Sequence, residues 1–128
     1  MNRKTFFTRA AVLSIAVAAP LFALAHPKLL SAVPAVNSHV AAVPATLRLT
    51  FQEPLEPALS RITIMHAGQH TVAVGAVHAD SADRKTLVAS INTPMGAGTY
   101  AVTWQAAGAD GHPMRGTYTF TVDAPSTK

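Results

Sequence analysis

The stretch Thr117-Tyr118-Thr119-Phe120-Thr121-Val122 decides the fold of this chain. Its large apolar side chains alternate strictly with threonines, and a period of two residues is typical of a β-strand that buries one face and exposes the other. The stretch from Tyr100 to Gln105 repeats the pattern, with Trp104 as its largest apolar residue. Because rings of that size are usually buried, we expect Trp104 to anchor the core rather than to stack on a ligand.

The alternation continues toward the N-terminus in shorter runs. Apolar residues recur with this period at 46–52, 61–65 and 72–74, a further apolar run covers 87–91, and residues 28–32 fit a first strand. Clusters of Pro, Gly and Asp separate the runs, and no segment shows a helical period. About seven short strands in about 100 residues predict an all-β domain, a seven-stranded antiparallel β-sandwich or Greek-key barrel of the immunoglobulin-like kind.

Residues 1–25 are predicted to be a secretory signal peptide. Three cationic residues precede an apolar stretch at 10–24, and Ala23-Leu24-Ala25 has the small-x-small pattern of a cleavage site. An uncleaved anchor is the alternative, but the stretch falls short of the ~20 apolar residues that span a membrane comfortably. We therefore expect cleavage after Ala25, export, and one mature domain at residues 26–128.

Charge and cysteine content exclude several classes of function. The chain has ten Lys and Arg against six Asp and Glu, but three of the ten lie in the predicted leader, so the mature net charge is +1. With no nucleic-acid-binding motif either, nucleic acid is not an expected partner. The absence of cysteine excludes thiolate metal sites, cysteine nucleophiles and redox dithiols. A metal must then be held by His, Asp, Glu, Met or an amino terminus.

Cleavage after Ala25 would make His26 the first residue. The α-amine and the ring Nδ1 of a terminal histidine can bind one metal together and close a chelate ring. The amine has a reference pKa of roughly 7.7–8.0, so a metal can displace its proton near neutral pH. Pro27 has no amide hydrogen to lose, so Cu(II) cannot continue along the backbone and must find its other ligands elsewhere in the fold.

Asp110-Gly111-His112-Pro113 supplies candidates for those ligands. If the segment is extended, residues two apart point to the same side, about 6–7 Å from each other, and their side chains can converge on one ion. The pair alone is weak evidence, because two exposed polar loop residues would explain it equally. Together with His26, however, it gives an amine, two imidazoles and a carboxylate, a set suited to one tetragonal Cu(II) per chain.

Five stretches of the predicted mature chain carry a family resemblance. They are His26-Pro27-Lys28-Leu29-Leu30-Ser31, Leu49-Thr50-Phe51-Gln52-Glu53-Pro54-Leu55, Gly98-Thr99-Tyr100-Ala101-Val102-Thr103-Trp104, Asp110-Gly111-His112-Pro113-Met114-Arg115-Gly116 and Tyr118-Thr119-Phe120-Thr121-Val122. In this order they resemble the copper resistance protein C family, the CopC-type periplasmic copper-binding proteins.

The resemblance implies a soluble, non-enzymatic periplasmic copper carrier or buffer with a seven-stranded Greek-key fold. The family's Cu(II) ligands correspond to His26, Asp110 and His112. Glu53 falls at an acidic position near that site and is either a supporting partner or an ordinary solvated carboxylate. The implied partners are an inner-membrane copper resistance D-type importer and other periplasmic copper proteins.

A second, Cu(I) site is in doubt. Some family members hold Cu(I) in a methionine-rich loop with a histidine, but the matching region here, Met65 to His70, has one methionine. Soft Cu(I) sites need several sulfurs, so we expect Met65, Met95 and Met114 to be packing residues. The histidines in and near this region, His66, His70 and His78, either form a substitute imidazole site or are exposed polar residues around a hairpin, and we favour the second interpretation, as for His39.

Two other classes of function stay open at this point. Polysaccharide mono-oxygenases also bind copper through an N-terminal histidine beside a second histidine. Against this copper mono-oxygenase alternative, the mature chain lacks an aromatic-rich flat surface, and Asp110 would fill a position that oxygen chemistry needs open. The other alternative is an immunoglobulin-like adhesion or structural module, which would bind no metal tightly.

Overall fold

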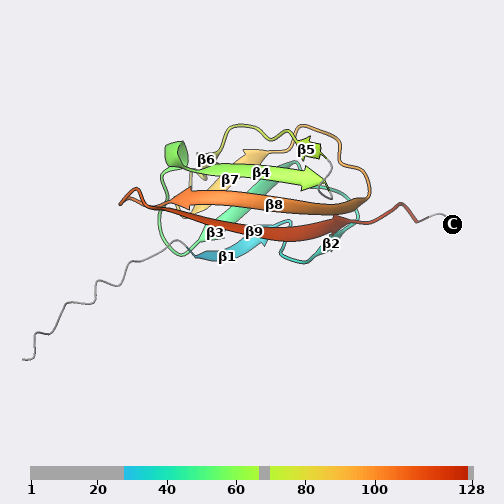
Figure 1. Cartoon of the computed structure of the whole chain (residues 1–128), viewed down its shortest axis with the longest axis horizontal. Coiled ribbons are helices and arrows are strands. Elements are labelled where there is room, and N and C mark those ends of the chain that lie inside the picture. The colour runs from blue at the N-terminus through green and yellow to red at the C-terminus, as the bar shows by residue number, and fades with distance from the viewer. Residues whose placement is uncertain (1–27, 67–69, 127–128) are drawn as a thin grey trace, which may run out of the picture.

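The computed structural model describes residues 28–66 and 70–126, which form two facing β-sheets (Figure 1). The first sheet has the strand order β1-β3-β7-β6 and consists of β1 (Leu29–Val33), β3 (Thr46–Phe51), β7 (Thr86–Ser90) and β6 (His78–Ala79). The second has the order β2-β9-β8-β4-β5 and consists of β2 (His39–Val40), β9 (Pro113–Val122), β8 (Gly98–Ala107), β4 (Arg61–His66) and β5 (His70–Val72).

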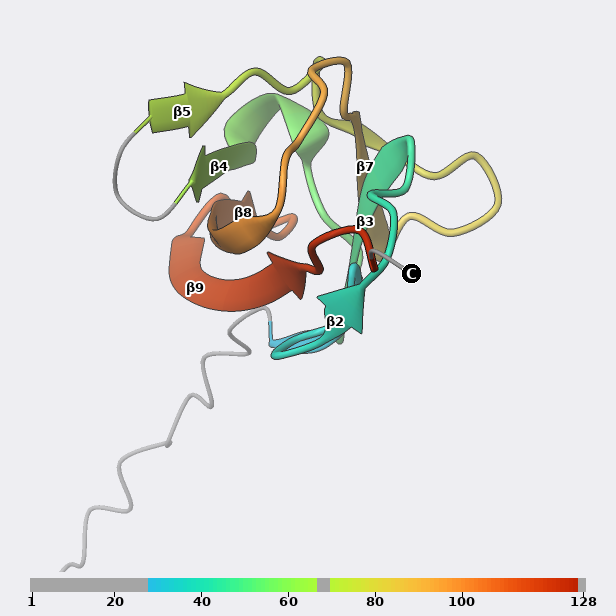
Figure 2. The same ribbon diagram turned by 90° about the vertical axis from the view of Figure 1, so that its right-hand side faces the viewer.

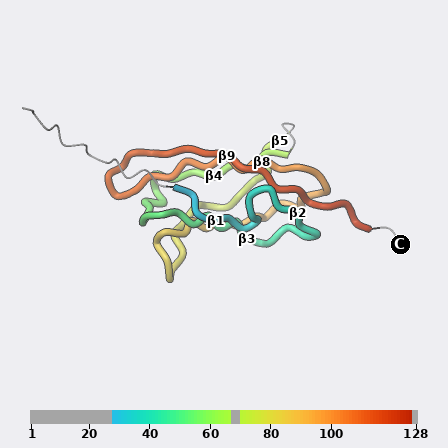
Figure 3. The backbone as a smooth tube through the Cα atoms, turned by 90° about the horizontal axis from the view of Figure 1, so that it is seen from below, coloured from blue at the N-terminus to red at the C-terminus, as the bar shows by residue number. Residues whose placement is uncertain are grey.

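Strands that pair in space are often far apart in sequence. In the first sheet β3 pairs with β7, and in the second β4 pairs with β8, so the chain repeatedly crosses from one layer to the other. All strand pairs are antiparallel except β2 and β9, which run parallel. Figure 3 shows β4, β8 and β9 in one layer and β1 and β3 in the other, and Figure 2 looks along the sandwich from one end.

The core lies between the layers and is built from the alternating apolar residues. The rings of Phe51 and Trp104 meet across it edge to face, with centroids 4.9 Å apart. Trp104 is only 7% exposed, which confirms the prediction that it anchors the core. The other strand residues buried here include Leu47, Leu49, Ile62, Ile64, Tyr100, Val102, Tyr118, Phe120 and Val122.

Trp104 fits because the residue opposite it on β9 has no side chain. Trp104 pairs with Gly116 across the β8–β9 ladder. A Cβ atom added at Gly116 would lie 2.6 Å from Cε2 of the indole, far inside van der Waals contact. The ring therefore lies directly against the glycine, in space that a side chain at position 116 would fill.

The all-β, two-sheet prediction is confirmed, but the described residues form nine strands where the pattern indicated about seven. Two of the nine, β2 and β6, are two residues long, and β5 has three. Runs this short cannot display a period of two, so they leave little trace in the pattern. The only helical element in the described part is one 3₁₀ turn, Pro57–Leu59, which precedes β4.

Candidate metal centre

Asp110 and His112 lie on the turn that joins β8 to β9. β8 ends at Ala107 and β9 begins at Pro113, so the turn lies at one end of the longest hairpin in the sandwich (Figure 1). The Gly111 amide donates to the Gly108 carbonyl at 3.0 Å and closes the turn. Gly111 has φ of 77°, in the left-handed region that glycine enters without strain.

The turn brings the two predicted ligands into direct contact. Asp110 Oδ1 accepts the backbone N–H of His112 at 3.1 Å, and Asp110 Oδ2 lies 3.2 Å from His112 Nδ1. The two side chains lie together as predicted, but the segment is a turn, so the extended backbone considered for it does not apply. Hydrogen bonding of an aspartate to the chain two residues on replaces strand alternation as the cause.

This contact affects the pKa of Asp110 and determines which ring nitrogen of His112 stays free. The backbone N–H of His112, and then its ring, hold the pKa of Asp110 below the ordinary value of 3.8. The carboxylate is therefore ionised at neutral pH. When Nδ1 of His112 donates to it, Nε2 keeps its lone pair for a metal. Both side chains are exposed, so an ion reaches them from solvent.

A second carboxylate, Glu53, flanks the same turn. A Cβ atom on Gly108 would lie 3.4 Å from Glu53 Oε1 and 3.7 Å from Asp110 Oδ1, so both carboxylates face this glycine. In the described ranges Glu53 makes no ion pair. The end of the sandwich that carries Asp110 and His112 is therefore rich in oxygen donors.

The described chain begins at this same end. The Lys28 carbonyl accepts a hydrogen bond from the amide of Gln52, the neighbour of Glu53, at 2.9 Å, and Leu29 pairs with Phe51. Leu55 then forms a bridge with Gly108 of the turn. Figures 1 and 3 show β1 starting on the side where β8 turns into β9. The predicted ligand His26 and the predicted signal peptide, residues 1–25, lie outside the described residues.

Within residues 28–66 and 70–126, no group of three or more His, Asp or Glu side chains is placed to hold a metal ion. The alternative site of His66, His70 and His78 is therefore not assembled. His66 and His70 face each other across the β4–β5 pair, with ring centroids 5.1 Å apart. His78 pairs with Val88 in the other sheet. His78 is separated from His66 and His70 because β6 belongs to the other layer.

His66 is not the exposed polar residue that the sequence predicted. Its ring stacks on Tyr100 with centroids 4.5 Å apart and lies directly over Gly98. Its Nδ1 is buried, and no described residue is a hydrogen-bond partner for it. His70 and His78 are exposed as expected. His39 is also exposed, with Nδ1 2.9 Å from Asp123 Oδ1.

Of the methionines in the described residues, some are partly buried and one is exposed. Met95 and Met114 pack partly buried against the core, as expected. Met65 is 44% exposed, so its assignment as a packing residue is wrong. Met65 pairs with Ala101, which places it on the outer face of the sheet, whereas Met114 pairs with the buried Ala106. The thioethers do not share one face.

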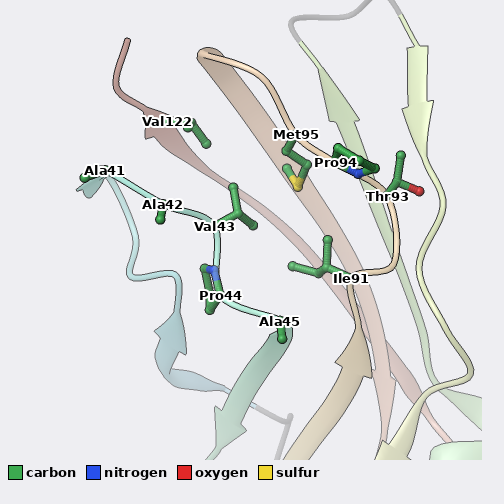
Figure 4. Close-up of a pocket in the computed structure, with 10 residues that line it drawn as sticks. All are labelled: Ala41, Ala42, Val43, Pro44, Ala45, Ile91, Thr93, Pro94, Met95 and Val122. Carbon is green, nitrogen blue, oxygen red and sulfur yellow. The ribbon is translucent and has the colours of Figure 1, made fainter. Parts of the chain in front are cut away.

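A hollow of about 430 Å³ lies away from the turn, between residues 41–45 and the segment around Met95 (Figure 4). Val122, which pairs with Gly98 at the start of β8, lines it. The hollow and the Asp110–His112 pair therefore occupy opposite ends of the β8–β9 hairpin. In the described part of the chain, no helix is long and apolar enough to span a membrane.

The fold and this turn define a class of small β-sandwich proteins that carry a carboxylate–imidazole pair at one end. The chain belongs to the CopC family, since the model of the CopC domain matches residues 29–123. It is 38% identical over 125 residues to copper resistance protein C of Escherichia coli, covering 93% of this chain and 95% of that protein.

Solved structures agree with this assignment. The crystal structure of PcoC, a methionine-rich copper resistance protein from Escherichia coli, is 40% identical, with a TM-score of 0.69 over 77% of this chain and 100% of that one. The crystal structure of CopC from Methylosinus trichosporium OB3b is 30% identical, with a TM-score of 0.72 over 80% of this chain and 99% of that one.

Proposed function

We propose that the chain, cleaved after Ala25, is a periplasmic copper carrier or buffer that binds one Cu(II) through His26, Asp110 and His112. The observation that supports it best is the Asp110–His112 contact of 3.2 Å, which presents an ionised carboxylate and a free imidazole nitrogen at the end where the described chain begins. Copper is the cargo, and no chemical step on it is required.

The distance along the chain is compatible with a contribution from His26. His26 is two residues before Lys28, and an extended chain covers at most ~7 Å in two residues. Lys28 is bonded to Gln52, the neighbour of Glu53, and Glu53 flanks the turn through Gly108. A terminal amine and a second imidazole are therefore within reach of the donor pair.

The donor set favours Cu(II) over other divalent metals. An amine, two imidazoles and a carboxylate provide nitrogen and oxygen in a tetragonal arrangement, and Cu(II) heads the affinity order above Zn(II) and Ni(II). Because Asp110 holds Nδ1 of His112, the nitrogen that we assign to copper is Nε2. A carboxylate on Nδ1 lies across the ring from an ion on Nε2, so Asp110 must release Nδ1 when copper binds in order to ligate the same ion. Glu53 adds negative charge that attracts the cation.

The role as carrier rather than enzyme rests on the names of the relatives, which are copper resistance proteins. An ion held by residues on an exposed turn can pass to another protein without opening the core. We propose an inner-membrane D-type importer and other periplasmic copper proteins as its partners.

A copper titration of protein that begins at His26 tests the function. We expect one Cu(II) per chain, an EPR spectrum of a tetragonal site with nitrogen and oxygen ligands, and displacement of Zn(II) by Cu(II). A flat titration, or a preference for Zn(II), would refute the proposal. Production of peroxide from ascorbate and oxygen, with cleavage of a polysaccharide, would favour the mono-oxygenase alternative.

A further inference from the structure

A row of three polar residues crosses the outer face of the second sheet, near the end that carries Asp110 and His112. Arg61 on β4 pairs with Gln105 on β8, and Gln105 pairs with Arg115 on β9. Directly paired residues in an antiparallel sheet project from the same face, and neighbouring strands are about 4.8 Å apart. The two arginines are therefore held about 10 Å apart, measured between backbones, with Gln105 between them.

The two arginines of the row give this face a positive charge, and among the described residues no carboxylate pairs with either of them. Ion pairs in the described residues use Arg48 and Arg84, but neither Arg61 nor Arg115. Arg115 donates from Nε to Oε1 of Gln105 at 3.0 Å, which fixes the stem and leaves the outer nitrogens of the guanidinium for another acceptor.

A groove lies between the two arginines. It has a volume of about 240 Å³ and is lined by Arg61, Thr63, Thr103, Trp104, Gln105 and Arg115. The next row of the sheet, Thr63-Thr103-Thr117, supplies hydroxyl groups beside it. Guanidinium groups bind carboxylates through two parallel hydrogen bonds, and hydroxyls add donors to the same oxygens.

We propose that this row, Arg61-Gln105-Arg115, is a docking surface for an extended acidic segment of a partner protein. In an extended segment, carboxylates two residues apart lie about 7 Å from each other, within the combined reach of two long arginine side chains. A recessed groove favours an inserted peptide over a flat anionic membrane. Gln105 and Arg115 lie on the β8–β9 hairpin, so a partner docked here lies beside the turn that carries Asp110 and His112.

This inference does not depend on copper, so its test uses metal-free protein. The probe is a fluorescein-labelled hexaglutamate peptide, measured by anisotropy at low ionic strength, with labelled hexaglutamine as the uncharged comparison. The test variant is R61Q/R115Q. The matched control is R84Q/K85Q, which also removes two positive charges, but from the exposed turn before β7, outside this face. Far-ultraviolet circular dichroism checks that all three proteins are folded.

We expect hexaglutamate to bind, hexaglutamine not to bind, and R61Q/R115Q to weaken binding at least about fivefold, the scale of losing two exposed ion pairs. The control should change affinity less than about twofold. Equal losses in the two variants would show an effect of net charge alone and overturn the proposal, as would no binding of hexaglutamate. Arginine-dependent binding to phosphatidylglycerol vesicles without peptide binding would assign the face to a membrane and overturn it too.

Discussion

Nδ1 of His112 lies 3.2 Å from Oδ2 of Asp110, two residues earlier on the same turn. A carboxylate that holds one nitrogen of an imidazole orients the ring and raises the basicity of the other nitrogen. In the proposed site, Asp110 can therefore act in one of two ways, as a ligand through its own oxygen or as the partner that orients the ring of His112. The two residues should not respond equally to substitution.

We expect His112→Ala to weaken Cu(II) binding more than Asp110→Ala, because it removes a nitrogen donor. Asp110→Ala should cost about 10–100-fold in affinity, the scale observed when a partner of a ligating histidine is removed. The measurement is Cu(II) competition with a chelator at fixed pH, on protein that begins at His26. His78→Ala, an exposed histidine on β6, is the control and should bind normally. If either ligand variant binds like wild type, that residue is not a ligand.

The N-terminus provides a sharper test of the proposed site. Protein that begins at His26 should bind Cu(II) more tightly than protein that retains Ala25, because an extra residue turns the His26 amine into an amide, which is not a basic donor at neutral pH. The chelate ring of amine and imidazole then cannot form. Equal affinities of the two proteins would remove the terminal amine from the site and leave an ordinary imidazole–carboxylate cluster.

Cu(I) should bind weakly. Met65 and Met114 lie against Ala101 and Ala106 of β8 and on opposite faces of the sheet, so their sulfurs cannot meet at one ion. Replacing Met65, Met95 and Met114 together by leucine should leave Cu(I) affinity unchanged, measured against a Cu(I)-selective chromophore. A tight Cu(I) site that disappears in the triple variant would contradict this expectation.

The packing of Trp104 against Gly116 predicts that a side chain at position 116 destabilises the fold. Gly116→Ala places a methyl group against the indole and should lower the free energy of unfolding by about 1–3 kcal/mol, the usual cost of overpacking a core. Gly96→Ala is the matched control, since a Cβ there meets no atom within 4 Å. Urea unfolding measures both. Equal stability of the two variants would mean that the ring moves aside without cost.

Asp80 should make stability depend on pH. The amide of Ala82, and then the side chain of Arg48, hold the pKa of Asp80 below its ordinary value of 3.8. A depressed carboxylate pKa stabilises the fold above the unfolded pKa, and this contribution is lost as the pH falls through the folded pKa. Asp80→Asn should therefore be less stable than wild type at pH 7, and the difference should vanish in acid below both pKa values.

Thermal unfolding of Asp80→Asn and wild type from pH 7 down to pH 2 checks this. Glu56→Gln is the comparison, because its contact with Arg84 is 3.8 Å long and exposed, and such a pair contributes little. A difference between Asp80→Asn and wild type that stays constant across the whole range would show that the carboxylate acts through shape and not through charge.

The sequence predicted the elements whose period is long enough to see. β8 and β9 each have ten residues, and their alternation located both strands and the burial of Trp104. The sequence did not predict β2 and β6, because a strand of two residues shows no period. β2 forms through its parallel pairing with the far end of β9, a long-range contact that no local pattern encodes.

For the candidate site too, the sequence predicted what a local motif encodes and missed what long-range pairing creates. Asp110 and His112 were found because both donors lie in one short motif, although the extended backbone considered for that motif is a turn in the structure. The environment of His66 was missed, because its ring meets Tyr100 and Gly98 only once β4 and β8 pair in their actual register. A glycine 32 residues away gives no local signal of such a contact.

The direction of β9 has a practical consequence for handling the molecule. From the turn at Pro113 the strand runs the whole length of the sandwich, so residues 123–126 emerge at the end opposite Asp110 and His112 (Figure 1). A dye, a surface tether or a fused reporter attached there stands clear of the donor pair. Immobilising the protein by that end would leave Asp110 and His112 turned toward the solution, accessible for sensing or exchange.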